Sequence, residues 1–235
     1  MKILITGTSS GLGFGLANYY LSEGHSVYGI SRRTNAELNR FGNFYFLAQD
    51  ISDFDKLGKS LATFLRRAGN LDLAILNAGM LNEVKDMNET TLEEIEKVMN
   101  VNVWANKLII DVLFSELEYV SQIVAISSGA SVSGSRGWNA YSLSKATLNM
   151  LIQLYANEQP NTHFCALAPG LVDTAMQEYI SGLSGEKDFA TIKRMKEVRA
   201  SGKMPSVDEA AKTCALAIKK VRDHESGLFL DVRKM

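Results

Sequence analysis

Short apolar segments alternate with longer amphipathic segments along almost the whole chain, and this alternation constrains the fold more than any other feature. Several of the apolar segments are continuously hydrophobic, as expected of parallel strands that helices cover on both faces. Such alternation predicts an α/β fold, a three-layer doubly wound parallel sheet of about seven strands with right-handed crossovers. The segments predicted as strands are residues 2–6, 26–30, 44–48, 71–76, 122–127, 163–168 and 227–232.

Two helix starts are visible as capping boxes. The spacing is that of Thr91 with Glu94 and of Ser206 with Glu209. In a capping box the side chain of each of the two residues accepts a hydrogen bond from the backbone N–H of the other. With no linker, repeat or low-complexity tract, the 235 residues are expected to form one domain, 1–235. Residues 175–204 break the alternation, because they are polar and charged. This segment is predicted to be a lid or substrate loop.

Composition excludes several classes of protein. A net charge of −1 gives no reason to expect a nucleic-acid partner. No apolar run approaches the roughly 18 residues of a membrane span. Cys165 and Cys214 form no CxxC motif, which predicts buried reduced thiols in a cytoplasmic protein. The histidines His25, His163 and His224 are far apart in sequence, so no metal site is predicted.

A glycine-rich stretch, TGTSSGLG at residues 6–13, directly follows the first predicted strand. Gly7, Gly11 and Gly13 would allow a sharp turn into a helix whose free N–H groups point at a pyrophosphate. A plain tight turn is the alternative. The glycine-rich stretch is the first strand-to-helix turn of an α/β chain, and this position favours a dinucleotide site and hence a Rossmann-type domain.

The end of the second strand bears on which dinucleotide is bound. An acidic residue there would bond the ribose hydroxyls, but this chain has Arg32 and Arg33. A guanidinium can pair with a 2′-phosphate, so NADP(H) is favoured over NAD(H), unless the two arginines are a solvated pair. Asp50 and Ile51, after the third strand, are predicted to contact the adenine.

Tyr141 and Lys145 lie four residues apart and would face the same way from one helix. A phenol with a pKa of about 10 is a poor proton donor and acceptor at neutral pH. A nearby ammonium and a positive nicotinamide ring are expected to lower that pKa. Ser128, after the fifth strand, would hold the substrate oxygen. The spacing of Tyr141 and Lys145 alone is a weak signal. Further motifs lie at the ends of other predicted strands or on adjacent helices: Asn77, Ala78 and Gly79 after the fourth strand, Asn102 in a helix that begins near Thr91, and Pro169 to Thr174 after the sixth strand.

Together these motifs resemble the short-chain dehydrogenase/reductase superfamily over essentially the whole chain. The resemblance implies a catalytic tetrad of Asn102, Ser128, Tyr141 and Lys145. In it Tyr141 is the general acid, and Asn102 holds a water of the proton relay. Ser10 departs from the basic residue that many NADP-preferring members have there. The predicted cofactor-binding residues are Gly7, Ser9, Ser10, Gly11, Leu12, Gly13, Arg32, Arg33, Asp50, Ile51, Asn77, Ala78, Gly79, Val101, Tyr141, Lys145, Pro169, Gly170, Val172 and Thr174.

Within the superfamily, the stretches GWNAYSLSKATLNM and SGLFLDVRKM resemble sepiapterin reductase and bacterial benzil-reductase-like enzymes. That resemblance implies that Asp231 anchors the guanidine group of a pterin; the alternatives are pairing with Arg233 or capping the last strand. Trp138, Met176 and Tyr179 are expected to shape an aromatic or apolar substrate pocket, or else to be core or interface. With Ser128 and Tyr141, the predicted substrate contacts are Trp138, Met176 and Asp231.

The expected function is an NADPH-dependent reductase of small ketones or diketones, with a pterin ketone as a rival substrate. A non-catalytic NADP(H)-sensing regulator is the alternative, although such proteins commonly lose the tyrosine or the lysine. An epimerase or dehydratase of nucleotide sugars is disfavoured, because it needs a larger C-terminal region. The resemblance also implies a homodimer or homotetramer that packs through helices near residues 91–115 and 139–157.

Overall fold

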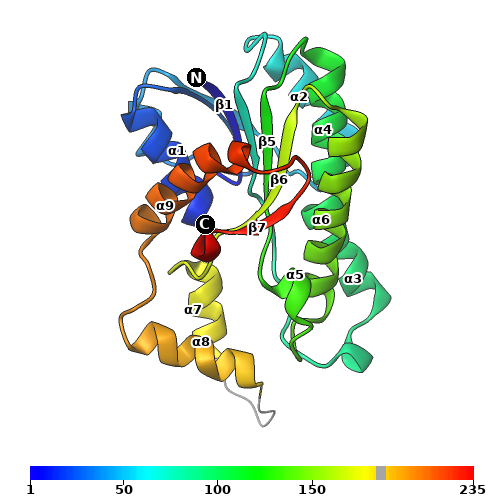
Figure 1. The fold of residues 1–235 in the computed structure, drawn as a ribbon, viewed down its shortest axis with the longest axis vertical. Helices are drawn as coiled ribbons and strands as arrows, with labels where there is room; N and C mark the ends of the chain where they lie inside the picture. The colour runs from blue at the N-terminus through cyan, green and yellow to red at the C-terminus, as the bar shows by residue number, and fades with distance from the viewer. Residues whose placement is uncertain (184–188) are drawn as a thin grey trace.

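The computed structural model describes residues 1–183 and 189–235. The described chain forms one parallel sheet of seven strands in the order β3-β2-β1-β4-β5-β6-β7 (Figure 1). This confirms the predicted doubly wound sheet. The strands are β1 (Lys2–Thr6), β2 (Ser26–Ser31), β3 (Phe44–Ala48), β4 (Leu73–Leu76), β5 (Gln122–Ile126), β6 (His163–Ala168) and β7 (Phe229–Asp231).

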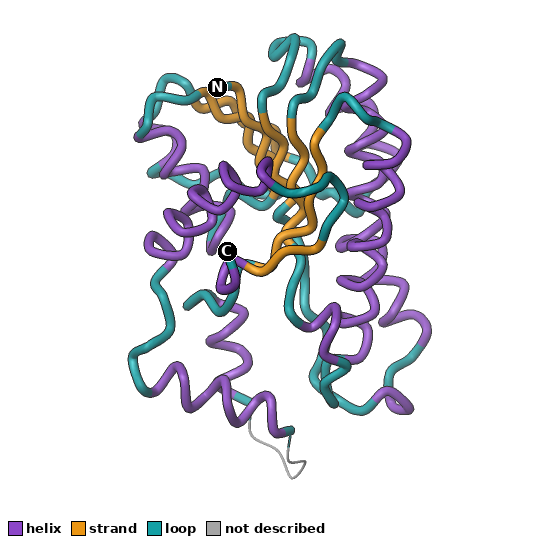
Figure 2. Tube along the Cα trace, viewed as in Figure 1, coloured by secondary structure: helices purple, strands orange, loops and turns teal. Residues whose placement is uncertain are grey.

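Helices cover both faces of the sheet, which makes three layers (Figures 1 and 2). On one face, α1 (Gly11–Ser22) packs beside α9 (Val207–Lys220). On the other lie α2 (Phe54–Leu65), α4 (Ala105–Glu116) and α6 (Asn139–Glu158). Each face has its own apolar core, so the central strands are buried on both sides. Within the described residues, no helix is long and apolar enough to cross a membrane.

The remaining elements are shorter and border the sheet. They are α3 (Leu92–Met99), a π-helical turn η3 (Asn100–Trp104), α5 (Ala130–Ser133), α7 (Ala175–Gly182), α8 (Ala190–Ala200) and the 3₁₀ turns η1 (Leu38–Arg40), η2 (Met87–Glu89), η4 (Val221–Asp223) and η5 (Val232–Lys234).

Both predicted capping boxes are confirmed. Thr91 accepts a hydrogen bond from the backbone N–H of Glu94, and Ser206 accepts one from Glu209. In each case the glutamate side chain bonds back to the capping residue, so α3 and α9 begin where the sequence predicted.

The segment from residue 175 to 204 is more ordered than the predicted loop. It contains α7 and α8, which lie beyond the carboxyl ends of the strands (Figure 1). Residues 184–188 of this predicted lid lie outside the described residues. The sequence did not predict α7 and α8 because the segment is mostly polar. Their few apolar residues pack on a small cluster instead of the main core. A role of the segment as a lid stays a prediction.

The order of the strands places a crevice between β1 and β4. Connections from β1 and from β4 run to opposite sides of the sheet, so the loops at the carboxyl ends of these strands diverge. Thr6 ties the two ends together: its Oγ1 accepts hydrogen bonds from the backbone N–H groups of Asn77 and Ala78, at 3.0 and 2.9 Å. Open α/β sheets bind ligands at such a switch point.

Candidate active site

A cleft of about 1250 Å³ opens at the carboxyl ends of the strands. Ligand pockets commonly measure roughly 300–1,000 Å³, so this cleft is larger than one small ligand requires. The loops after β1, β2, β3, β4, β5 and β6 all contribute to its wall, together with α3, α7 and α8.

The turn after β1 has no room for a side chain at Gly7. Gly7 has φ +78°, and a Cβ there would lie 2.9 Å from Asn77 Nδ2 and 3.0 Å from Ala78 Cα. Ser10, the N-cap of α1, makes no side-chain cap, unlike Thr91 and Ser206. The first N–H groups of α1 are therefore free to bind an anion. These features fit the pyrophosphate of a dinucleotide.

Gly13 was predicted to contact the cofactor, but it does not line the cleft. A Cβ on Gly13 would lie 2.3 Å from the Gly7 carbonyl oxygen and 2.4 Å from Asn77 Nδ2. The residue must be glycine so that α1 can pack directly on the turn. Its part in the site is structural.

The end of the cleft next to β2 and β3 contains Arg32 but not Arg33. The backbone carbonyl of Arg33 accepts a hydrogen bond from Ser31 Oγ at 2.8 Å, and its side chain is exposed outside the cleft. Asp50 and Ile51, which were predicted to contact the adenine, line the cleft. Hydrogen bonds from Ser52 hold the pKa of Asp50 below its usual range, so this carboxylate is ionised and already fixed by its own turn.

Tyr141 and Lys145 project from one face of α6 into the cleft and are almost fully buried. Lys145 Nζ lies 5.8 Å from the centroid of the Tyr141 ring and donates a hydrogen bond of 2.7 Å to the Ile126 carbonyl. Burial lowers the pKa of Lys145 to about 8. Burial also raises the pKa of Tyr141, and a hydrogen bond with Ser128 only partly opposes this.

The lowering of the Tyr141 pKa expected from the sequence includes the effect of a positive nicotinamide ring, and it stays a prediction. Burial penalises the phenolate more than the hydrogen bond with Ser128 favours it. The result is a phenol that stays protonated at neutral pH, which is the state that a proton donor needs.

Asn102 is fully buried and does not line the cleft. Its Oδ1 accepts from the backbone N–H of Met80 at 2.8 Å, and its Nδ2 donates to the Met80 carbonyl and to Ser144 Oγ. The side chain thus joins the loop after β4 to α6, from the π-helical turn that separates α3 from α4. The predicted role of Asn102 in holding a water stays a prediction.

Ser128 sits in a loop that a hydrogen-bond network holds in place. Its Oγ accepts from the backbone N–H of Ala130 at 3.1 Å, and its carbonyl accepts from Ser131 Oγ at 2.7 Å. Asn149 of α6 accepts from Ser127 Oγ at 2.6 Å and donates to Ser131 Oγ at 2.9 Å. Asn149 therefore fixes the serine loop from behind.

The wall on the far side of Tyr141 is apolar. Trp138 is 4% exposed, and its ring lies 5.8 Å from that of Tyr141, centroid to centroid. Met176 of α7 packs on the same cluster, and both residues line the cleft beside Tyr141. Tyr179 is 44% exposed and outside the cleft, which rules against its predicted place in the pocket.

A family model described as short chain dehydrogenase matches residues 1–182. The chain belongs to the short-chain dehydrogenase/reductase family. It is 32% identical over 248 residues to a benzil reductase ((S)-benzoin forming) of Saccharomyces cerevisiae, covering 97% of this chain and 94% of the relative. A Bacillus subtilis benzil reductase ((S)-benzoin forming) is 29% identical, with 98% of each chain covered.

The fold of this dehydrogenase/reductase also matches a solved structure. A short-chain dehydrogenase/reductase from Saccharomyces cerevisiae superposes with a TM-score of 0.86 at 26% identity, covering 98% of this chain and 95% of the other. The chain is therefore an oxidoreductase of this family, and nicotinamide dinucleotides are the cofactors of the family.

Asp231 lies beside the cleft of this dehydrogenase/reductase but does not line it. Its carboxylate accepts from Arg233 Nε at 2.8 Å, from Nη2 at 2.5 Å and from the backbone N–H at 3.0 Å. This is the pairing that the sequence left open as an alternative to a pterin anchor. The side chain that reaches the cleft is Arg233.

Several residues that line the cleft were not among the predicted site residues. Gln177 of α7 is buried, and its Oε1 has no hydrogen-bond partner within the described part of the chain. Arg194 and Met195 come from α8, in the segment predicted to be a loop, and Arg233 comes from η5. Gln177, Arg194 and Met195 had a coarse signal, because they lie in the segment predicted to be a lid or substrate loop, and Arg233 lies two residues from the predicted anchor Asp231.

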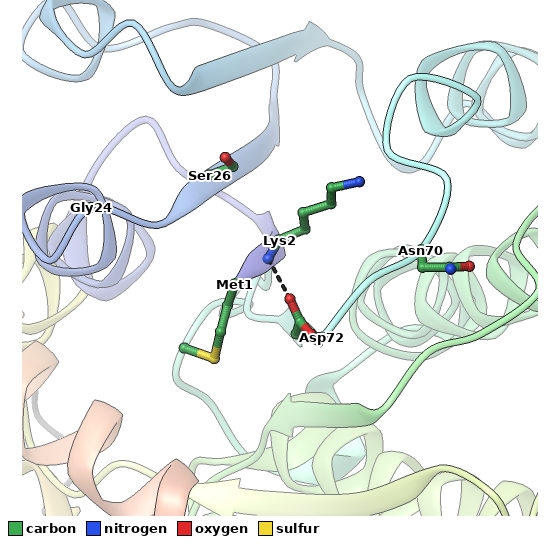
Figure 3. Close-up of a pocket in the computed structure, with 6 residues that line it drawn as sticks. All are labelled: Met1, Lys2, Gly24, Ser26, Asn70 and Asp72. Carbon is green, nitrogen blue, oxygen red and sulfur yellow. Dashed lines mark hydrogen bonds between the residues drawn. The ribbon is translucent and has the colours of Figure 1, made fainter.

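A smaller hollow lies at the opposite, amino-terminal end of the sheet (Figure 3). Lys2, Asn70 and Asp72 are among the residues around it, and Asp72 accepts a 2.6 Å hydrogen bond from the backbone N–H of Lys2. This bond joins the start of β1 to the start of β4. We assign the hollow no role in catalysis, because it is separated from the cleft by the length of the strands.

Proposed function

We propose that this dehydrogenase/reductase is an NADPH-dependent reductase of ketones and 1,2-diketones, with Tyr141 as the general acid. The observation that carries the proposal is the position of a protonated, buried Tyr141 between Ser128, Lys145 and an apolar wall. The two benzil reductases support the diketone class, because they match this chain over nearly its whole length.

The residues of the cleft suit each part of a nicotinamide dinucleotide. The turn at Gly7 and the N-terminus of α1 would hold the pyrophosphate, and Asp50 and Ile51 would border the adenine. Arg32 would pair with a 2′-phosphate, which supports NADP(H) over NAD(H). When bound, the reduced nicotinamide supplies a hydride.

The protein's own part in the reaction is to orient the ketone and to supply a proton. The backbone N–H of Ala130 occupies one lone pair of Ser128 Oγ, and the serine proton, which bonds Tyr141 in this structure, would turn to bond the substrate oxygen. Tyr141 donates its proton to that oxygen as the alcohol forms. The ammonium of Lys145 stabilises the phenolate that remains, and the surrounding apolar wall excludes water.

The proposal is tested by incubating the protein with NADPH and a panel of ketones and diketones while NADPH consumption is followed. Tyr141→Phe should lower kcat by at least about 100-fold, because general acid catalysis is worth that much. Its Kd for NADPH should stay within about threefold, since the phenol makes few of the cofactor contacts. Turnover of no compound by the wild-type protein would refute the proposal and favour the NADP(H)-sensing alternative.

The choice of cofactor has its own test. Arg32→Ala should lower the ratio of kcat/KM for NADPH over NADH by at least about tenfold, since a charge-assisted bond to the phosphate is lost. Arg33→Ala is the matched control, because Arg33 lies outside the cleft. An equal effect of both substitutions would contradict the role given to Arg32.

We also propose a cytoplasmic homodimer. The two free, buried thiols, Cys165 and Cys214, suit a reducing compartment. Leu143, Met150 and Leu154 of α6 are about half exposed, and their spacing places them on one face of the helix. Such an exposed apolar stripe fits a contact with a second copy of this chain.

A further inference from the structure

Arg233 is a cationic side chain immediately beside the catalytic serine loop. It lines the cleft, and a Cβ on Gly129 would lie 3.6 Å from its Nη2. A Cβ on Gly170 would lie 3.5 Å from its Cδ. The arginine therefore lies between the loops that follow β5 and β6, and Gly129 is the next residue after Ser128. A substrate whose carbonyl oxygen bonds Ser128 would extend past this guanidinium.

The guanidinium is held in a fixed orientation by Asp231. Two parallel hydrogen bonds, from Nε at 2.8 Å and from Nη2 at 2.5 Å, define its plane. Asp231 is 8% exposed, whereas the side chain of Arg233 is 59% exposed. Within the described residues Nη1 makes no hydrogen bond, so its two N–H groups are left to bind a ligand.

The charges of the pair select the kind of group that binds there. Asp231 and Arg233 neutralise each other, and their hydrogen bond holds the pKa of Asp231 below its usual range. The pair thus presents N–H donors without a net charge, which suits the oxygen of a neutral carbonyl. Arginine has no acceptor, so the donor-rich amino-pyrimidine edge of a pterin finds no partner there unless Arg233 is displaced.

We propose that Arg233 binds the second carbonyl oxygen of a 1,2-dicarbonyl substrate through Nη1, and that Asp231 is the residue that positions it. The inference rests on the proposed function, since it assumes that Ser128 and Tyr141 bind the first carbonyl. It adds a residue that determines specificity for diketones to the same site. Diketones are bound at two points, whereas a monoketone is bound at one.

Two compounds that differ at one position separate these cases. Benzil has two adjacent carbonyls, and deoxybenzoin has a methylene in place of one of them. Arg233→Met keeps the unbranched stem of the side chain and removes its hydrogen-bond donors. We expect it to lower kcat/KM for benzil by about 10- to 100-fold, the usual value of a hydrogen bond from a charged group. The kcat/KM for deoxybenzoin should change by less than about threefold, because it has no second carbonyl oxygen to bind the arginine.

Asp231→Asn tests the positioning role. It should raise KM for benzil more than it lowers kcat, since the guanidinium stays present but is no longer held in place. Lys234→Met is the control, because Lys234 is exposed on the same turn and does not line the cleft. Wild-type Kd values for NADPH in all variants would show that folding and cofactor binding are intact.

The possible failures are distinct. A wild-type protein that reduces no dicarbonyl contradicts the proposed function itself. If the wild type reduces benzil but Arg233→Met affects benzil and deoxybenzoin equally, or affects neither, the role of Arg233 is wrong. A higher kcat/KM for a pterin diketone than for benzil, abolished by Asp231→Asn and not by Arg233→Met, would overturn the inference in favour of a carboxylate anchor.

Discussion

Gly13 offers the sharpest test of how the nucleotide-binding turn is built, because a matched glycine exists elsewhere. Gly13 and Gly58 both lie in α-helices, and neither has a positive φ. A Cβ on Gly58 would meet nothing within 4 Å, whereas a Cβ on Gly13 would lie 2.3 Å from the Gly7 carbonyl oxygen. Alanine is the better helix former at both positions, so packing alone decides the difference.

The magnitude follows from these contacts. In Gly58→Ala, helix propensity should stabilise the protein by up to about 1 kcal/mol. In Gly13→Ala, the same gain is offset by overpacking against backbone, which costs up to about 3 kcal/mol. We therefore expect a net loss of about 2 kcal/mol. For a chain of this size, Tm should fall by roughly 4–8 °C in Gly13→Ala and rise by roughly 2–4 °C in Gly58→Ala.

Thermal unfolding followed by circular dichroism measures both shifts, and a fluorescence titration measures NADPH binding. Gly13→Ala should also weaken NADPH binding by about tenfold or more, because the Gly7 turn must move to admit the methyl group. Gly58→Ala should bind NADPH as the wild type does. If Gly13→Ala matches Gly58→Ala in Tm and binds NADPH normally, the reasoning about this turn is refuted.

Three further outcomes are expected. With NADPH as the varied substrate, kcat/KM should fall as pH rises through about 8, because Lys145 loses its proton there. Lys145→Arg stays charged and should remove this fall. An unchanged pH profile in that variant would contradict the assignment to Lys145. Asn149→Leu should lower kcat for ketone reduction by about tenfold, because the serine loop loses its support. The Kd for NADPH should stay within about twofold. An equal loss of kcat and of NADPH affinity would point to general misfolding. Leu154→Glu should convert the proposed dimer to a monomer by light scattering, as a buried carboxylate without a partner is costly, and a monomeric wild type would contradict the dimer.

Much of the site was visible in the sequence because its parts are local. Tyr141 and Lys145 share a helix face by their spacing alone, and the turn at Gly7 follows its strand directly. The carboxyl ends of parallel strands meet at one edge of a sheet, so the order of the motifs along the chain was enough to place residues after different strands together. Arg33 and Gly13 were predicted to contact the cofactor as well, but each lies one position from a residue that lines the cleft and does not line it itself.

What the sequence determined by itself was therefore the periodic part: strands, helix starts, and the order of polar motifs along the sheet. Only the tertiary structure decided the partners that come from distant segments. It showed that the side chain of Asn102 hydrogen-bonds Met80 and Ser144, and that Asn149 supports the serine loop. It also showed that burial raises the pKa of Tyr141. Hydrogen-bond partners and desolvation depend on how several elements pack together in space, and no local pattern of residues records that packing.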